Sequence, residues 1–182
     1  VAYENMLVSA LLRAKELASK GVELFASPAL KFFLYNDINR ERFKSDPKCL
    51  ENFILLDDND IWTALKVWCN HNDIILATLS QGMVNREIFK VEVSPTPCTE
   101  ERLNAISERI AKQLHINKED TRYFISTPSI EKNMYNPADD SIDILYNDGS
   151  TTNIAEASDM LHLSVLSKKV KKYYICYLRE KK

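Results

Sequence analysis

The sequence contains little glycine and little histidine, and these scarcities exclude several kinds of site. It has three glycines and three histidines in 182 residues. Gly21, Gly82 and Gly149 stand far apart, so neither a dinucleotide-binding G-x-G-x-x-G nor a P-loop G-x-x-x-x-G-K-[ST] can be written. The histidines are equally scattered, whereas a zinc site needs clustered ligands. Any phosphate that binds this chain must therefore be held by side chains.

Other absences narrow the class of protein. No apolar run approaches the ~20 residues that cross a bilayer, so we expect no membrane segment. The formal net charge is −2, which provides no general basic field for nucleic acid or an anionic membrane. The four cysteines include no C-x-x-C pair, and together with the lack of a signal peptide they predict reduced thiols in the cytoplasm.

The first half of the chain has helical periodicity. Apolar residues recur at helical spacing over residues 3–20, and Gly21 is well placed to end that helix. A polar loop is expected over residues 36–47. Further helices are predicted over residues 28–34, 50–54, 61–68 and 75–83.

At Arg86 the spacing of apolar residues changes from the helical period to the alternation typical of strands. Phe89, Val91 and Val93 alternate with charged residues, which predicts a strand. A hairpin turn is predicted further along the chain by the residues Asn147-Asp148-Gly149-Ser150. A helix over 103–114 and another over 160–165 separate strands over 123–127, 142–146 and 173–177.

This order predicts an α+β fold with two parts. Residues 1–83 form a helical subdomain, and residues 84–182 form an α+β accessory subdomain with the ferredoxin-like order β-α-β-β-α-β and an extra hairpin.

Arg86 and Lys90 are the candidate site residues. In strand geometry they share one face with Ile88, opposite Glu87 and Phe89. Two cations on one face, just after a helix, can clamp a phosphate or a triphosphate. The alternative is a solvated strand edge with no ligand.

Other polar clusters have structural explanations. Asp57, Asp58 and Asp60 could hold a hard metal ion, but carboxylates at this position are typical of a helix start. His71-Asn72-Asp73 lacks the adjacent His-Asp pair of a metal-dependent phosphohydrolase and is read as a turn between helices. Tyrosine-rich strands could stack on single-stranded RNA. The negative net charge argues against nucleic acid, and so does the absence from every predicted strand of the glycine that an RNA-recognition motif requires.

Several stretches, taken in order, resemble the C-terminal part of bacterial HD-domain phosphohydrolases, relatives of the SAM-and-HD-domain deoxynucleoside triphosphate triphosphohydrolase. The resemblance covers essentially the whole chain. The stretches are residues 3–8 running into 12–15, 56–62, 85–90, and 141–144 with Asp148-Gly149 and 156–158.

The resemblance implies a parent enzyme whose metal site lies upstream. The reaction would be hydrolysis of a nucleotide phosphate, with Mn, Mg or Fe as the divalent metal of the HD domain. No cofactor or catalytic residue would lie in this chain, which alone would not be catalytic. Val1 stands uncapped inside a helical pattern, so we expect a longer protein upstream.

The resemblance also implies a regulatory role. Arg86 and Lys90 match an Arg and a Lys that contact the phosphates of an activating nucleotide at a subunit junction in the mammalian relative. The partners implied are the HD domain of the same protein, further copies of the chain in a homo-oligomer, and a nucleotide effector. The alternative is a non-enzymatic α+β interaction or ligand-binding module.

Overall fold

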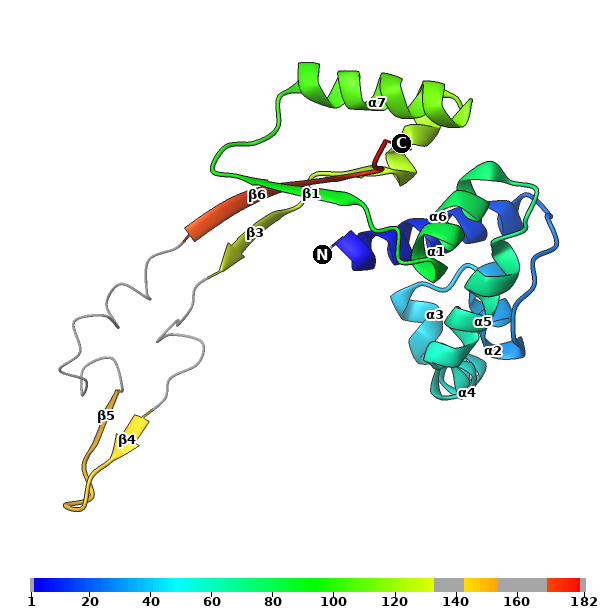
Figure 1. Cartoon of the computed structure of the whole chain (residues 1–182). Coiled ribbons are helices and arrows are strands. Elements are labelled where there is room, and N and C mark those ends of the chain that lie inside the picture. The colour runs from blue at the N-terminus through cyan, green and yellow to red at the C-terminus, as the bar shows by residue number, and fades with distance from the viewer. Residues whose placement is uncertain (1, 133–142, 154–169, 181–182) are drawn as a thin grey trace. The chain divides into compact units, whose positions relative to one another are not determined.

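The computed structural model describes residues 2–132, 143–153 and 170–180 (Figure 1). These residues divide into two compact units. The first lies within Val1–Glu92, Thr99–Ser126 and Ile175–Lys182, and the second within Val93–Cys98 and Thr127–Tyr174.

The first unit begins with six helices. Their bounds are α1 Ala2–Ser19, α2 Pro28–Tyr35, α3 Arg40–Ser45, α4 Pro47–Leu55, α5 Asp58–Trp68 and α6 Ile74–Val84. The helices predicted from periodicity are confirmed. The polar loop expected over 36–47 is wrong, because Asn39 caps the short helix α3 by accepting from the backbone N–H of Arg42 at 2.8 Å.

The core of this unit lies where α1 and α5 pack against α6. Met6, Trp68 and Leu76 are almost fully buried there. Gly82 permits the close approach of α6 to α1, because a Cβ at this position would lie 2.8 Å from Met6 Cε. Among the described residues, no helix is long and apolar enough to cross a membrane.

Polar side chains start the helices, as the sequence predicted for the acidic cluster. Asp57 accepts from the backbone N–H groups of Asn59 at 2.7 Å and Asp60 at 3.3 Å. The Asp60 carboxylate accepts in return from Asp57 N–H at 2.8 Å. This capping box satisfies backbone donors at the start of α5, and the capping interpretation is confirmed.

In the rest of the described chain the elements are a helix, a 3-10 helix and six strands. They are β1 Lys90–Ser94, α7 Glu100–Leu114, η1 Lys118–Tyr123, β2 Ile125–Ser126, β3 Ser129–Lys132, β4 Asp143–Leu145, β5 Thr151–Asn153 and β6 Val170–Tyr177. Strand order in the main sheet is β1-β6-β2, and β3 also pairs with β6. Strands β2 and β3 each pair antiparallel with β6, with Ile125 opposite Tyr177 and Ser129 opposite Tyr173.

The hairpin predicted at Gly149 is confirmed. Strands β4 and β5 pair antiparallel, with Leu145 opposite Thr151. Gly149 has φ +85°, a conformation that its missing Cβ permits, and Asp148 accepts from Ser150 N–H at 2.9 Å.

The α+β class is confirmed, with helices followed by strands. The finer ferredoxin-like arrangement is not. The second helix of that pattern, over 160–165, lies outside the described residues, as does the start of the strand over 142–146. In the described sheet the last strand, β6, lies between β1 and β2, whereas a ferredoxin-like sheet has its last strand at an edge. The division into 1–83 and 84–182 stays a prediction.

Candidate functional site

Arg86 lies directly after α6 in a backbone conformation typical of glycine, with φ +60°. Its N–H donates to Met83 O at 3.3 Å, and Glu87 N–H donates to Gly82 O at 2.8 Å. These two bonds form the Schellman motif, in which the residue after the helix cap adopts the left-handed conformation.

Helix α1 ends in the same motif, but there Gly21 occupies the left-handed position, with φ +81°. A residue with a Cβ is disfavoured in this conformation by about 1–2 kcal/mol. The chain therefore carries an arginine at one helix end where it carries glycine at another. Backbone strain of this kind clusters at functional sites, which makes the Arg86 side chain a candidate functional group.

Arg86 lines a cleft of about 810 Å³ on the first unit, here named the first cleft. Glu87, Gln113, Arg179 and Glu180 also line it. Arg86 is exposed, and within the described part of the chain no ion-pair partner faces its guanidinium. The group is thus placed to meet an anion from solvent.

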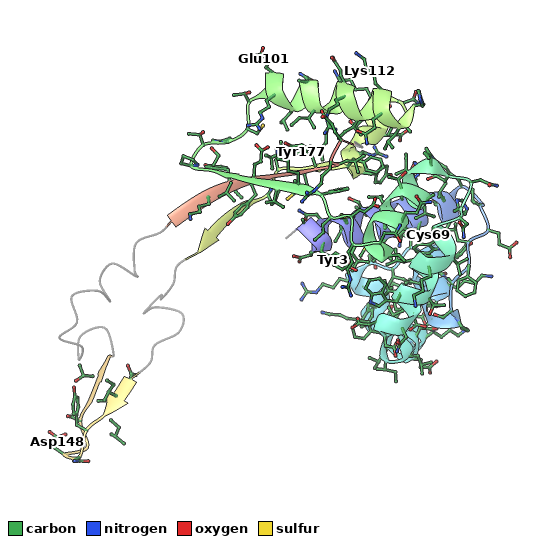
Figure 2. All side chains as sticks on the ribbon, viewed as in Figure 1. Tyr3, Cys69, Glu101, Lys112, Asp148 and Tyr177 are labelled. Atoms are coloured by element: carbon green, nitrogen blue, oxygen red, sulfur yellow. The ribbon has the colours of Figure 1, made fainter. Side chains whose placement is uncertain are left out.

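Lys90 is the first residue of β1 and lines an adjoining cleft of about 440 Å³, here named the second cleft. Three more cations line this cleft, namely Arg102 and Arg109 of α7 and Arg179 beyond β6. The side chain of Tyr177, which Figure 2 labels, also lines it. The second cleft therefore concentrates positive charge in a chain whose net charge is −2.

The sequence placed Arg86 and Lys90 on one face of a single strand, and that geometry is wrong. Strand β1 begins only at Lys90, while Arg86 is held in the turn after α6. The backbone bonds of the Schellman motif turn the chain there, which periodicity cannot reveal. The two residues instead line adjoining clefts that share Arg179 and Glu180.

Glu92 is the internal partner of the second-cleft cations. Its carboxylate accepts from the Tyr177 hydroxyl at 2.6 Å and pairs with Lys90 Nζ at 2.9 Å and with Arg102. The hydrogen bonds from Tyr177, Lys90 and Arg102 lower the pKa of Glu92 to about 2 against burial, which acts the other way. Glu92 is therefore ionised at neutral pH.

Arg109 and Arg179 are positioned by backbone carbonyls. Arg109 Nη2 donates to Leu178 O at 2.7 Å, and its guanidinium lies 5.6 Å from the Tyr177 ring centroid. Arg179 Nε donates to Ile88 O at 2.9 Å. These bonds use some of the donors of each guanidinium and hold both groups at the cleft wall.

Sequence reasoning missed Arg102, Arg109 and Arg179. The spacing of Arg102 and Arg109 could have indicated that they lie together, because residues seven apart on a helix share a face. No sequence signal places Arg179 near them, because its position follows from the pairing of β6 in the sheet.

A separate ion-pair cluster fastens α1 to its neighbours. Arg13 donates to both carboxylate oxygens of Asp73, at 3.1 and 2.6 Å, and Tyr123 donates to Glu16. Bonds from Lys20 and Tyr123 lower the pKa of Glu16 to about 2, and the bond to Asp73 raises that of Arg13. Because Asp73 also caps α6, we assign this cluster to stability.

No group of three or more His, Cys, Asp or Glu side chains able to hold a metal occurs among the described residues. His71 Nδ1 instead accepts from Asp73 N–H at 3.0 Å, which fits the predicted turn between α5 and α6.

Comparison with solved structures found a strong similarity over almost the whole chain. A solved structure, described as a phosphohydrolase from Bacteroides thetaiotaomicron, shares 69% sequence identity over 98% of this chain, with a TM-score of 0.93. This chain is similar to part of a phosphohydrolase. It spans 44% of the length of that protein. No family model matches the sequence, and no curated protein matches it.

Proposed function

We propose that this chain is part of a metal-dependent nucleotide phosphohydrolase of the HD type, resembling a deoxynucleoside triphosphate triphosphohydrolase. The observation that carries the proposal is the 69% identity to a phosphohydrolase of which the chain spans 44%. The motif resemblance described above supports the finer assignment. The divalent metal and the catalytic residues belong, in this proposal, to the portion outside this chain.

The role of this region is assembly and regulation. Arg86 and Lys90 bind the phosphates of an effector nucleotide, and further copies of the chain complete the site. What supports this is the gathering of cations around two adjoining clefts, with Arg86 held in a disfavoured conformation at one of them. Guanidinium and ammonium groups are the usual side-chain partners of phosphate.

The activity itself is tested on the full-length protein, whose gene should encode an H…HD…D pattern ahead of Val1. We expect release of phosphate or triphosphate from deoxynucleoside triphosphates in the presence of Mn²⁺ or Mg²⁺. The 182-residue chain alone should release none. Turnover by the isolated chain would contradict the assignment of catalysis to the missing portion.

The effector role is tested with Arg86→Ala and Lys90→Ala, assayed with and without added nucleotides. Each variant should lose most of the activation. Lys118→Ala is the matched control, because the Lys118 side chain is 52% exposed, against 53% for Lys90, and pairs with Glu108 outside both clefts. Unchanged activation in both cleft variants would remove the effector proposal.

A non-enzymatic interaction module is the second candidate, and the exposed surface of α4 fits it as well as it fits assembly of the enzyme. Phe53, Ile54 and Leu55 are 56%, 72% and 70% exposed. Exposed apolar side chains gathered at one end of a helix are typical of a protein–protein contact. An unrelated sequence ahead of Val1, without the H…HD…D pattern, would favour this candidate over the enzyme.

A further inference from the structure

Four cations line the second cleft, and two of them lie at one aromatic ring. Lys90 Nζ lies 5.7 Å from the Tyr177 ring centroid, and Arg109 lies 5.6 Å from it. Arg102 and Arg179 extend this set along the cleft wall. Cations that line one cleft repel one another, so a nearby anion stabilises the arrangement.

Glu92 provides that anion within the chain. Its side chain is 26% exposed and accepts from Tyr177, Lys90 and Arg102, while Lys90 and Arg102 are each 53% exposed. Both cations can therefore be approached from solvent while they hold the carboxylate. Glu92 and an incoming phosphate would compete for the same donors.

We propose that the second cleft binds a triphosphate group by anion exchange, in which phosphate oxygens displace Glu92 from Lys90 and Arg102. Arg109 and Arg179 supply further donors along the cleft. The inference rests on the proposed phosphate-binding role of Lys90. It makes Glu92 a specificity-determining residue, because a single-charge anion gains little by replacing a carboxylate, whereas a polyanion also engages the other two guanidinium groups.

The test is calorimetric titration of the full-length protein with inorganic tripolyphosphate. Glu92→Gln should bind about tenfold more tightly than the wild type, since about 1.4 kcal/mol of competition is removed. Glu180→Gln is the matched control: it removes one negative charge from a residue that lines the cleft, but Glu180 is 75% exposed and 3.6 Å from Arg109. We expect its affinity to change less than about twofold.

Glu92→Asp provides a second variant, which keeps the net charge of the wild type. Its shorter side chain cannot reach all three donors, so tripolyphosphate should again bind more tightly. Deoxyadenosine triphosphate titrated alongside distinguishes a nucleotide from an inorganic polyphosphate. The gain on changing Glu92 should appear with both, because the exchange involves only phosphates.

Lys90→Ala separates this inference from the proposed function. One outcome would overturn the exchange and leave phosphate binding standing. In that outcome Lys90→Ala loses binding, while Glu92→Gln and Glu92→Asp bind no more tightly than the wild type. Equal gains in Glu92→Gln and Glu180→Gln would also overturn the exchange, because they would show a net-charge effect. Failure of every variant to bind either compound, or binding that Lys90→Ala leaves unchanged, would overturn both.

Discussion

At the scale of single residues, Arg86 combines a disfavoured backbone with an exposed cation. The Schellman bonds at the end of α6 require the left-handed conformation whatever the residue there, and glycine adopts it without penalty. Glu92 has the opposite character, because three donors satisfy its carboxylate. Arg86 thus has a strained backbone and an exposed side chain, whereas the Glu92 carboxylate is paired and ionised.

Arg86→Gly should therefore raise the free energy of unfolding by about 1 kcal/mol, since glycine removes the Cβ penalty. The same variant should lose effector activation as Arg86→Ala does. Denaturant unfolding measures the first effect. Gly21→Ala, at φ +81°, is the converse control and should destabilise by a similar amount. Equal stability of Arg86→Gly and Arg86→Ala would contradict the strain argument.

Acid should destabilise the protein through Glu16 and Glu92. Their pKa values fall from 4.5 to about 2 in the folded chain, so each contributes stability that is complete above pH 4.5. That contribution is lost as pH falls through about 2, where the folded protein also takes up the proton. Urea unfolding between pH 5 and 2 should show a declining midpoint. The decline should be shallower in Glu16→Gln and Glu92→Gln.

At the scale of elements, the contact of α1 with α6 depends on both packing and charge. A Cβ at Gly82 would lie 2.8 Å from Met6 Cε, so the end of the Met6 side chain would have to shift, and Arg13 reaches across to Asp73. Asp73 serves twice, since it accepts from Leu76 N–H at 2.8 Å as the cap of α6. The start of α6 is thereby fastened to the middle of α1.

Arg13→Met should destabilise the fold by about 2 kcal/mol, because it leaves the carboxylate of Asp73, 15% exposed, without its cation. Asp73→Asn keeps a good helix cap while removing the charge. The double variant should recover part of the loss in a double-mutant cycle of denaturant unfolding. Additive effects of the two substitutions would show that the pair is not coupled.

At the scale of the whole molecule, α4 presents an apolar surface to solvent. Surfaces of this kind mark contacts with other protein, and the proposed phosphohydrolase would cover it by assembly. Four of its residues are more than half exposed, namely Leu50, Phe53, Ile54 and Leu55.

Ile54→Glu should weaken the proposed assembly without weakening the fold. The side chain is 72% exposed, so the free energy of unfolding should stay within about 0.5 kcal/mol of the wild type. Sedimentation velocity of the full-length protein should show smaller species. Lys48→Glu, on the same helix and exposed, is the control and should leave the assembly intact. An unchanged sedimentation profile for Ile54→Glu would exclude this face as the contact.

The sequence by itself determined most of the described helices though not α3, the hairpin turn at Gly149 and the capping of α5 by Asp57, because periodicity and caps act within a few residues. It also identified Arg86 and Lys90 as candidate phosphate ligands. Only the tertiary structure separated these two into adjoining clefts and brought Arg102, Arg109 and Arg179 beside Lys90. It alone placed the Tyr177 hydroxyl against Glu92, 85 residues away in the chain. Such positions depend on strand pairing and helix packing between distant segments, which no local pattern encodes.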